Sequence, residues 1–267
     1  MIGMEEVANE VDNLIGLAEA NKRRIAAGEK PYEVTNHLIL SGNPGTGKST
    51  VAVKIAELYN ALGILPEDKV TNLGKAELAG KFANANELAV KEIFEKGKGG
   101  VIFVDEAYML ANDQYGKNAT DQLVKEIEEN RGDTVVILAG YPEEMKQLMA
   151  TNQGLARRFP RTIEFPDYSV EDQQKILRSQ MANHNDKFAD AKTEKIANEA
   201  IKNVSRLGQN AGGVRNFHDA LVLARSSRLR GTNPSREADT TFVDTDISTA
   251  LKTLRVYPAG KGSLVGQ

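Results

Sequence analysis

The eight residues from Gly42 to Ser49 constrain the fold of this 267-residue chain more than any other segment. They read Gly-Asn-Pro-Gly-Thr-Gly-Lys-Ser and match G-x-x-x-x-G-K-[ST] in full, after an apolar run at 37–40 and before a helical pattern at 49–61. Glycines let successive backbone N–H groups turn inward, and the following helix directs its positive end to the same place. The segment predicts a phosphate-binding loop between a strand and a helix; the alternative is a chance glycine-rich turn.

The side chains of this loop have separate expected roles. Lys48 supplies an ammonium group for the β- and γ-phosphates of ATP, and Ser49 supplies a hydroxyl ligand for Mg²⁺. The loop therefore predicts ATP and Mg²⁺ as the cofactors. The residues expected to bind the nucleotide here are Pro44, Gly45, Thr46, Gly47, Lys48, Ser49 and Thr50.

Short apolar runs alternate with helical patterns up to about residue 167. Besides the run at 37–40, strands are expected at 70–73, 101–104, 135–138 and 162–165, and helices at 4–27, 49–61, 86–96, 118–130 and 142–150. Strands that are apolar on both faces suit a parallel sheet covered by helices, so residues 1–167 are predicted to form an α/β domain with five parallel strands. The long interval between Lys48 and Asp105, with a strand inside it, indicates a P-loop NTPase of the additional-strand type.

The pattern changes after Pro166-Asp167-Tyr168. Helices are expected at about 169–183, 193–206, 213–229 and 245–254, with no strand among them. We therefore expect residues 168–255 to form a small all-helical lid subdomain. Residues 256–267, with a proline and several glycines but no periodicity, are expected to form a C-terminal tail.

An acidic pair, Asp105-Glu106, ends the apolar run at 101–104. In a parallel sheet, side chains at the carboxyl ends of the strands face the ligand crevice. Asp105 is expected to hold Mg²⁺, and Glu106 to polarise a water at the γ-phosphate, which favours hydrolysis over transfer to a second substrate. The alternative is that the acids only cap the helix that follows.

Composition excludes several classes of protein. The chain has 34 Lys and Arg against 37 Asp and Glu, a net charge of −3, so it is not a generally basic nucleic-acid binder. Without cysteine and with only three separated histidines, a thiolate or histidine metal centre is not expected. No apolar run approaches about 18 residues, and the start has no signal-peptide pattern, so we expect a soluble cytoplasmic protein without membrane partners.

Several longer stretches carry a family likeness. They are 41–50 around the loop, 99–108 with Asp105-Glu106-Ala107-Tyr108, 139–141, and Phe165-Pro166-Asp167-Tyr168. Together these stretches resemble the CbxX/CfqX family of AAA+ ATPases, which includes red-type Rubisco activases and ATPase domains of type VII secretion proteins. The likeness runs from Ile2 to about residue 254 and so covers nearly the whole chain.

The resemblance implies further roles, each with a simpler alternative. Ile2 and Gly3 match the segment that holds adenine in such ATPases, although they also mark where the first helix begins. Tyr141 occupies the sensor position after the fourth strand and offers its hydroxyl to the γ-phosphate. Arg158, in Arg157-Arg158-Phe159, matches the arginine finger, and Arg161 is the candidate second finger; otherwise these arginines lie on a solvated loop.

The sequence departs from the family at two places. Gly212 stands where the family often has an arginine before the final helix, so Arg215 is either the second sensor or a residue that packs the lid. Residues 78–84 align with the central-pore loop, where Phe82 keeps the aromatic that grips a polypeptide and Lys81 reverses the usual charge. The alternative for Phe82 is a core aromatic at a helix start.

The leading hypothesis is a ring-forming ATPase that remodels a protein client. Because the chain's own strands separate Arg158 from the phosphate loop, this arginine would complete a neighbour's site, which predicts a homo-oligomer, commonly a hexamer in this superfamily. One alternative is a DNA-linked ATPase of the clamp- or helicase-loader type, with Arg225, Arg228 and Arg230 near phosphates, although cations there also suit the helix dipole. Another is an ATP-dependent switch that recruits a partner without threading.

Overall fold

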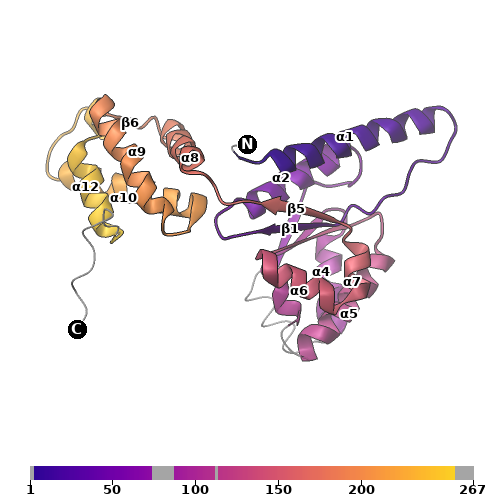
Figure 1. The fold of residues 1–267 in the computed structure, drawn as a ribbon. Coiled ribbons are helices and arrows are strands. Elements are labelled where there is room, and N and C mark those ends of the chain that lie inside the picture. Colours follow the sequence, from indigo (N-terminus) through magenta and orange to yellow (C-terminus); the bar gives the residue numbers. More distant parts are fainter. Residues whose placement is uncertain (1–2, 74–86, 112–113, 256–267) are drawn as a thin grey trace. The chain divides into compact units, whose positions relative to one another are not determined.

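The structure is a computed structural model that describes residues 3–73, 87–111 and 114–255 (Figure 1). The described residues divide into two compact units. The α/β unit takes in Met4–Asn43 and Gly47–Pro166, and the helical unit takes in the chain from Asp167 onwards together with Gly3 and Pro44–Thr46. The phosphate loop therefore has its two ends in the α/β unit and its tip grouped with the helical unit.

A five-stranded parallel sheet forms the centre of the α/β unit, in the order β2-β3-β4-β1-β5. β4 lies between β1, which leads into the phosphate loop, and β3, which ends at the acidic pair, so the predicted additional-strand sheet is confirmed. The predicted runs match the strands to within two residues. They are β1 (Leu38–Gly42), β2 (Val70–Leu73), β3 (Val101–Val104), β4 (Val135–Gly140) and β5 (Arg161–Phe165).

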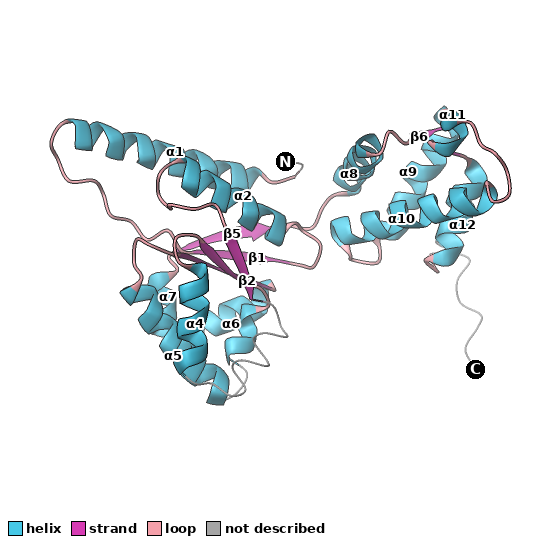
Figure 2. Ribbon diagram, turned by 180° about the vertical axis from the view of Figure 1, so that it is seen from behind, coloured by secondary structure: helices cyan, strands magenta, loops and turns pink. Residues whose placement is uncertain are grey.

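Both faces of this sheet are buried, as the apolar strands predict. Leu38 and Leu40 join a core with the helices α1 (Glu5–Ala26) and α2 (Lys48–Ala61), whereas Ile39 joins a second core on the opposite face. Figure 2 shows that second face under a separate group of helices. These are α4 (Glu87–Gly97), α5 (Gln114–Glu129), α6 (Pro142–Thr151) and α7 (Gln153–Arg158), with the 3₁₀ helix η1 (Ala107–Ala111) after β3.

The helical unit packs around its own core, which includes Leu177, Ile201 and Phe217. The expectation that no strand follows residue 167 is wrong, because β6 and β7 form a two-stranded parallel sheet in which Phe188 pairs with Phe242. Two-residue strands are too short to show a period in the sequence. The elements are α8 (Val170–Asn183), β6 (Lys187–Phe188), α9 (Ala191–Ser205), α10 (Asn210–Arg228), α11 (Arg236–Asp239), β7 (Thr241–Phe242) and α12 (Asp244–Thr253).

Four further differences from the expected helices have local causes. α7, α11 and η1 are each six residues or fewer, below the length at which amphipathic spacing can be recognised. α10 begins at Asn210 rather than near 213, because Gly212 and Gly213 have the low helix propensity that makes a sequence-based boundary fall late. No helix among residues 3–73, 87–111 and 114–255 is long and apolar enough to cross a membrane.

Candidate active site

The ammonium group of Lys48 is held by the loop in which it lies. Lys48 is the first residue of α2 and is 9% exposed. Its Nζ donates to the carbonyl oxygens of Gly42 at 2.7 Å and Asn43 at 3.0 Å. Burial lowers the pKa of Lys48, and the carboxylate of Asp105 works in the opposite direction. Lys48 and Asp105, which follow different strands, are thus within electrostatic range of each other.

The backbone of the loop is shaped to present N–H groups. Gly45 and Gly47 have φ angles of 74° and 97°, in the left-handed region that glycine adopts without a Cβ penalty. Gly47 is the N-cap of α2 and carries no side chain that could bond the first amides of the helix. Ser49 and Thr50 are exposed on the same first turn. Free amides at a helix start form a binding place for phosphate.

The tip of the loop is bonded within the helical unit. The Ala211 N–H donates to Gly45 O at 3.1 Å, and the Tyr168 hydroxyl donates to Thr46 O at 3.0 Å. Asn210 is 3% exposed and donates through Nδ2 to Pro44 O at 3.1 Å. Sequence reasoning assigned no role to Asn210 or Tyr168, although Tyr168 stands in a stretch that carries the family likeness.

Glycine is required at the loop tip for a second reason. A Cβ built on Gly45 would lie 2.4 Å from the carbonyl oxygen of Gln209, which is closer than a Cβ approaches in practice. Gly3 also has a positive φ, of 62°, and its Cβ would lie 3.3 Å from Tyr168 and Asp172. Both glycines therefore allow close packing inside the helical unit.

The acidic pair lies at the carboxyl end of β3. The Asp105 N–H donates to Leu73 O at 2.9 Å, which extends the β2–β3 ladder, and Asp105 Oδ1 accepts from the Glu106 N–H at 3.0 Å. Glu106 has a φ of 53°, a conformation that costs about 1 kcal/mol or more for a residue with a Cβ. Its Oε2 is buried and has no hydrogen-bond partner among the described residues. An unpaired buried carboxylate oxygen is available to accept a proton or a hydrogen bond.

Two tyrosines lie next to Glu106. The rings of Tyr108, in η1, and Tyr141, the N-cap of α6, are stacked with their centroids 5.4 Å apart and their planes at 23°. Burial raises the pKa of the Tyr108 hydroxyl, and the charge of Glu106 and hydrogen bonds with Glu106 and Tyr141 raise it further. The structure therefore brings together Glu106, Tyr108 and Tyr141. Of these, Tyr108 was noticed in the sequence only as part of the family motif.

The two candidate finger arginines both have partners within the chain. Arg158, at the end of α7, lies 3.1 Å from Glu128 and donates to Gly154 O at 3.0 Å. Arg161, at the start of β5, forms an ion pair with Glu10 and donates to Thr35 O at 2.8 Å. Each arginine side chain is 26% exposed. Their roles toward a nucleotide stay predictions.

Other predicted residues lie elsewhere. Arg215 is exposed on α10, in the helical unit, whereas Ile2, Lys81 and Phe82 lie outside the described residues. Arg225 and Arg228, two of the three arginines behind the DNA-linked alternative, form ion pairs with the buried carboxylates of Asp186 and Asp246. Buried ion pairs therefore hold those two arginines within the helical unit.

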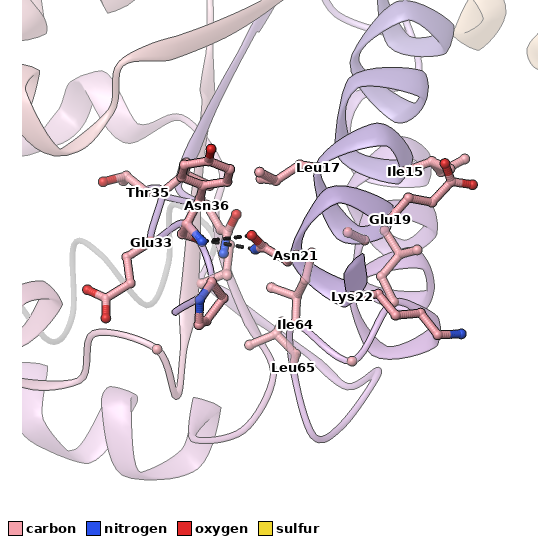
Figure 3. Close-up of a pocket in the computed structure, with 18 of the residues that line it drawn as sticks. Ile15, Leu17, Glu19, Asn21, Lys22, Glu33, Thr35, Asn36, Ile64 and Leu65 are labelled. Carbon is pink, nitrogen blue, oxygen red and sulfur yellow. Dashed lines mark hydrogen bonds between the residues drawn. The ribbon is translucent and has the colours of Figure 1, made fainter. Parts of the chain in front are cut away.

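A separate pocket of about 840 Å³ opens at the other end of the sheet (Figure 3). It is lined by the second half of α1, the segment 31–37 and the turns at 61–65 and 131–135. One wall is held by Asn21, which donates to Tyr32 O at 3.1 Å and accepts from the Tyr32 N–H at 2.7 Å. None of the predicted site residues lines this pocket. Because it lies at the amino ends of β1 and β4, it is distinct from the site at their carboxyl ends.

Comparison with known proteins identifies the family of this chain. The model of the family "ATPase family associated with various cellular activities (AAA)" matches residues 38–167. The plasmid protein CbxX of Cupriavidus necator is 30% identical over 98% of this chain and 85% of its own length, and CbbX of Cereibacter sphaeroides is 31% identical over 98% and 86%. The chain belongs to the AAA ATPases.

Membership of this family makes the protein a nucleotide-binding enzyme that hydrolyses ATP. The AAA ATPase is also 38% identical to the ESX-3 secretion system protein EccA3 of Mycolicibacterium smegmatis, over 63% of this chain and 28% of that protein. A solved structure, the Holliday junction branch migration motor RuvB of Thermotoga maritima, has the same fold with a TM-score of 0.62 at 17% identity, covering 96% of this AAA ATPase and 71% of RuvB.

Proposed function

We propose that this AAA ATPase couples ATP hydrolysis to remodelling of a protein client, as a homo-oligomeric ring with Mg²⁺ beside the nucleotide. The observation that carries the hydrolytic step is Glu106, whose Oε2 is buried and unpaired at the carboxyl end of β3, among the described residues. An enzyme that transfers phosphate to a second substrate has no need for a water-activating acid at this position. The similarity to CbxX and CbbX, which extends over 98% of this chain, supports an ATPase related to those proteins.

The residues around the loop fit ATP and Mg²⁺. The uncapped amides of α2 and the held ammonium of Lys48 suit the β- and γ-phosphates. Mg²⁺, when bound, neutralises charge on the phosphate oxygens, and the Ser49 hydroxyl and Asp105 carboxylate are oxygen donors of the kind it prefers. Thr50 would contact the phosphates from the first turn of α2. Ile2 and Gly3 would contact the adenine, and Arg215 the phosphates.

Glu106 is proposed as the general base of hydrolysis. Its free Oε2 accepts a proton from a water whose oxygen attacks the γ-phosphorus. The bond from that phosphorus to the bridging oxygen of ADP breaks, and ADP and phosphate leave. Lys48 and the loop amides hold the phosphates in place while this happens.

Arg158 is proposed to complete the site of a neighbouring subunit. In the chain by itself it pairs with Glu128, at 3.1 Å. Assembly would exchange this partner for a neighbour's γ-phosphate, and an arginine supplied in this way is worth about 10³–10⁵ in rate. This role requires an oligomer, and we propose a hexamer. Arg161 is kept as a candidate second finger.

The remaining parts of the proposal concern the client and the parts of the chain. Residues 1–167 would bind the nucleotide and residues 168–255 would act as its lid, with 256–267 as a tail. Lys81 and Phe82 would contact the client in the ring's pore. A cytoplasmic location, with no nucleic-acid or membrane partner, is part of the same proposal.

Mixing two inactive variants tests the ring. Arg158→Ala keeps its own Glu106 but lacks the finger, and Glu106→Gln keeps the finger but lacks the base. Each is expected to hydrolyse ATP at least about 100-fold more slowly than the wild type alone. In mixed rings, activity returns because the Arg158 of one chain completes the site of the other.

Two control variants distinguish the loss of the Arg158 side chain from the loss of its ion pair, and a dilution measurement tests the ring. Glu128→Ala breaks the same ion pair and is expected to keep full activity, as is Arg157→Ala next to the finger. ATPase activity per subunit of the wild type should fall on dilution. No recovery in the mixture, with constant activity per subunit on dilution, contradicts the ring. Stimulation by DNA that falls steeply with salt would favour a DNA-linked enzyme instead, and full cellular function of Glu106→Gln would favour the switch.

A further inference from the structure

Two buried side chains bond the tip of the phosphate loop through its carbonyl groups. Asn210 Nδ2 donates to Pro44 O at 3.1 Å. The Tyr168 hydroxyl donates to Thr46 O at 3.0 Å. Both side chains are buried, and neither belongs to the loop. Two peptide groups of the loop are therefore held from outside it.

The direction of each of these carbonyls sets the direction of an N–H group. In a trans peptide the C=O and the N–H point to opposite sides of the chain. The Pro44 carbonyl shares its peptide with the Gly45 N–H, and the Thr46 carbonyl shares its peptide with the Gly47 N–H. These two glycine N–H groups have no hydrogen-bond partner in the part of the chain that the structure describes. The side-chain bonds therefore turn both amides to the opposite side, where they are available to a phosphate oxygen.

The Asn210 side chain is bonded through both of its polar atoms. Besides the bond to the loop, Nδ2 donates to Asp167 Oδ1 at 2.8 Å, and Oδ1 accepts from the Tyr168 N–H at 2.9 Å. If the amide were turned over, its oxygen would face the Pro44 carbonyl and an ionised carboxylate, neither of which can donate. One orientation of the amide therefore satisfies all three bonds. Asn210 also has a φ of 50°, which asparagine tolerates better than most residues with a Cβ.

We propose that Asn210 and Tyr168 are positioning residues for the nucleotide, which orient the amides of the phosphate loop through its carbonyls. This inference rests on the proposed binding of ATP by the loop. Neither side chain contacts the phosphates itself. When one of the bonds is lost, its peptide is free to rotate, so the loop must be ordered again each time a phosphate binds. The loss therefore appears as weaker binding of nucleotide.

Variants of the full chain that remove each bond separately test this role. Tyr168→Phe removes the hydroxyl and keeps the ring, whereas Asn210→Gly removes the side chain and keeps a residue suited to the left-handed backbone. Each is expected to raise the Kd of a fluorescent ADP analogue about threefold to tenfold, the factor that corresponds to one hydrogen bond. The KM for ATP should rise by a similar factor while kcat stays within about threefold, because the loop holds the phosphates both before and during the reaction.

The matched control is Tyr59→Phe. The Tyr59 hydroxyl also donates to a backbone carbonyl at 3.0 Å, but this carbonyl belongs to Asn36, outside the phosphate loop. Tyr59→Phe is expected to lower the midpoint of urea unfolding and to keep the Kd of the ADP analogue within about twofold. If Tyr168→Phe behaves in the same way, its hydroxyl serves the fold alone and the inference is overturned.

Lys48→Ala separates this inference from the proposed function. If Lys48→Ala loses binding of the ADP analogue, while Tyr168→Phe and Asn210→Gly bind it as tightly as the wild type, the positioning role is wrong and the loop remains the phosphate site. If Lys48→Ala also binds the analogue as tightly as the wild type, the proposed function of the loop itself fails.

Discussion

His37 gives the α/β unit a dependence on pH that can be predicted with its sign. The side chain is 5% exposed, and its Nδ1 accepts a hydrogen bond from the Val136 N–H at 3.0 Å, which places the ring proton on Nε2. The ring packs on Phe159 with centroids 5.6 Å apart. Burial, with a smaller effect of Arg131, lowers the pKa of His37 from 6.5 to about 4. The folded protein therefore holds this histidine neutral.

The direction of the pH effect follows from the lowered pKa. Above pH 6.5 neither the folded nor the unfolded state binds the proton, so the protein has its full stability there. As the pH falls from 6.5 to about 4, the unfolded chain binds the proton and the folded protein does not, so the free energy of unfolding falls. At about 1.4 kcal/mol for each pKa unit, the loss is about 2 kcal/mol at pH 5 and about 3 kcal/mol below pH 4.

Urea unfolding of the wild type and of His37→Asn at pH 7.5 and pH 5 measures this effect. The Asn side chain can accept the same Val136 N–H through its amide oxygen but does not titrate. Loss of the contact with Phe159 lowers the stability of the variant at both pH values alike. The wild type should lose about 2 kcal/mol more than the variant between pH 7.5 and pH 5. Equal losses in the two proteins would refute the reasoning, because other titrating groups are common to both.

Two further predictions concern buried ion pairs. Asp186→Ala should lower the free energy of unfolding by about 3–5 kcal/mol in urea, because it leaves the guanidinium of Arg225, 11% exposed, and the ring of His218 without their carboxylate partner; a loss below about 1 kcal/mol would contradict it. Glu10→Gln should destabilise the protein by about 1–3 kcal/mol without changing kcat for ATP, because it removes the charged partner that holds Arg161 in place; an unchanged free energy of unfolding would contradict it.

The features that were predictable from the sequence are those with a strong local signal. Runs of four residues identified all five strands, and the glycine pattern identified the loop whose backbone has positive φ at Gly45 and Gly47. These features depend on neighbours in the chain, so one sequence is enough to find them. The strand at 70–73, inside the long interval between Lys48 and Asp105, predicts the additional-strand arrangement, and the observed order β2-β3-β4-β1-β5 confirms it.

The features that were not predictable depend on packing between distant segments. The pairing of Phe188 with Phe242 joins strands of two residues, and no period can indicate it. The stacking of Tyr108 on Tyr141 joins residues that follow β3 and β4, and no local pattern in the sequence indicates it. The partners of Arg158 and Arg161 likewise come from α5 and α1, far away in the sequence. A sequence motif identifies the candidate reacting groups, but it does not identify the distant residues that position those groups.

The two finger candidates differ in how easily each can leave its partner. Arg158 pairs with Glu128, whose side chain is 56% exposed, and an ion pair of this kind contributes about 0–1 kcal/mol. Arg161 pairs with Glu10, 14% exposed, and also bonds to Thr35 O, so its release would leave a poorly hydrated carboxylate behind. Breaking the Arg158–Glu128 ion pair, so that Arg158 can contact a neighbouring subunit, therefore costs little free energy. Breaking the Arg161–Glu10 ion pair would weaken the attachment of α1 to β5. On energetic grounds, Arg158 is the residue suited to act between subunits, and Arg161 is suited to hold the fold.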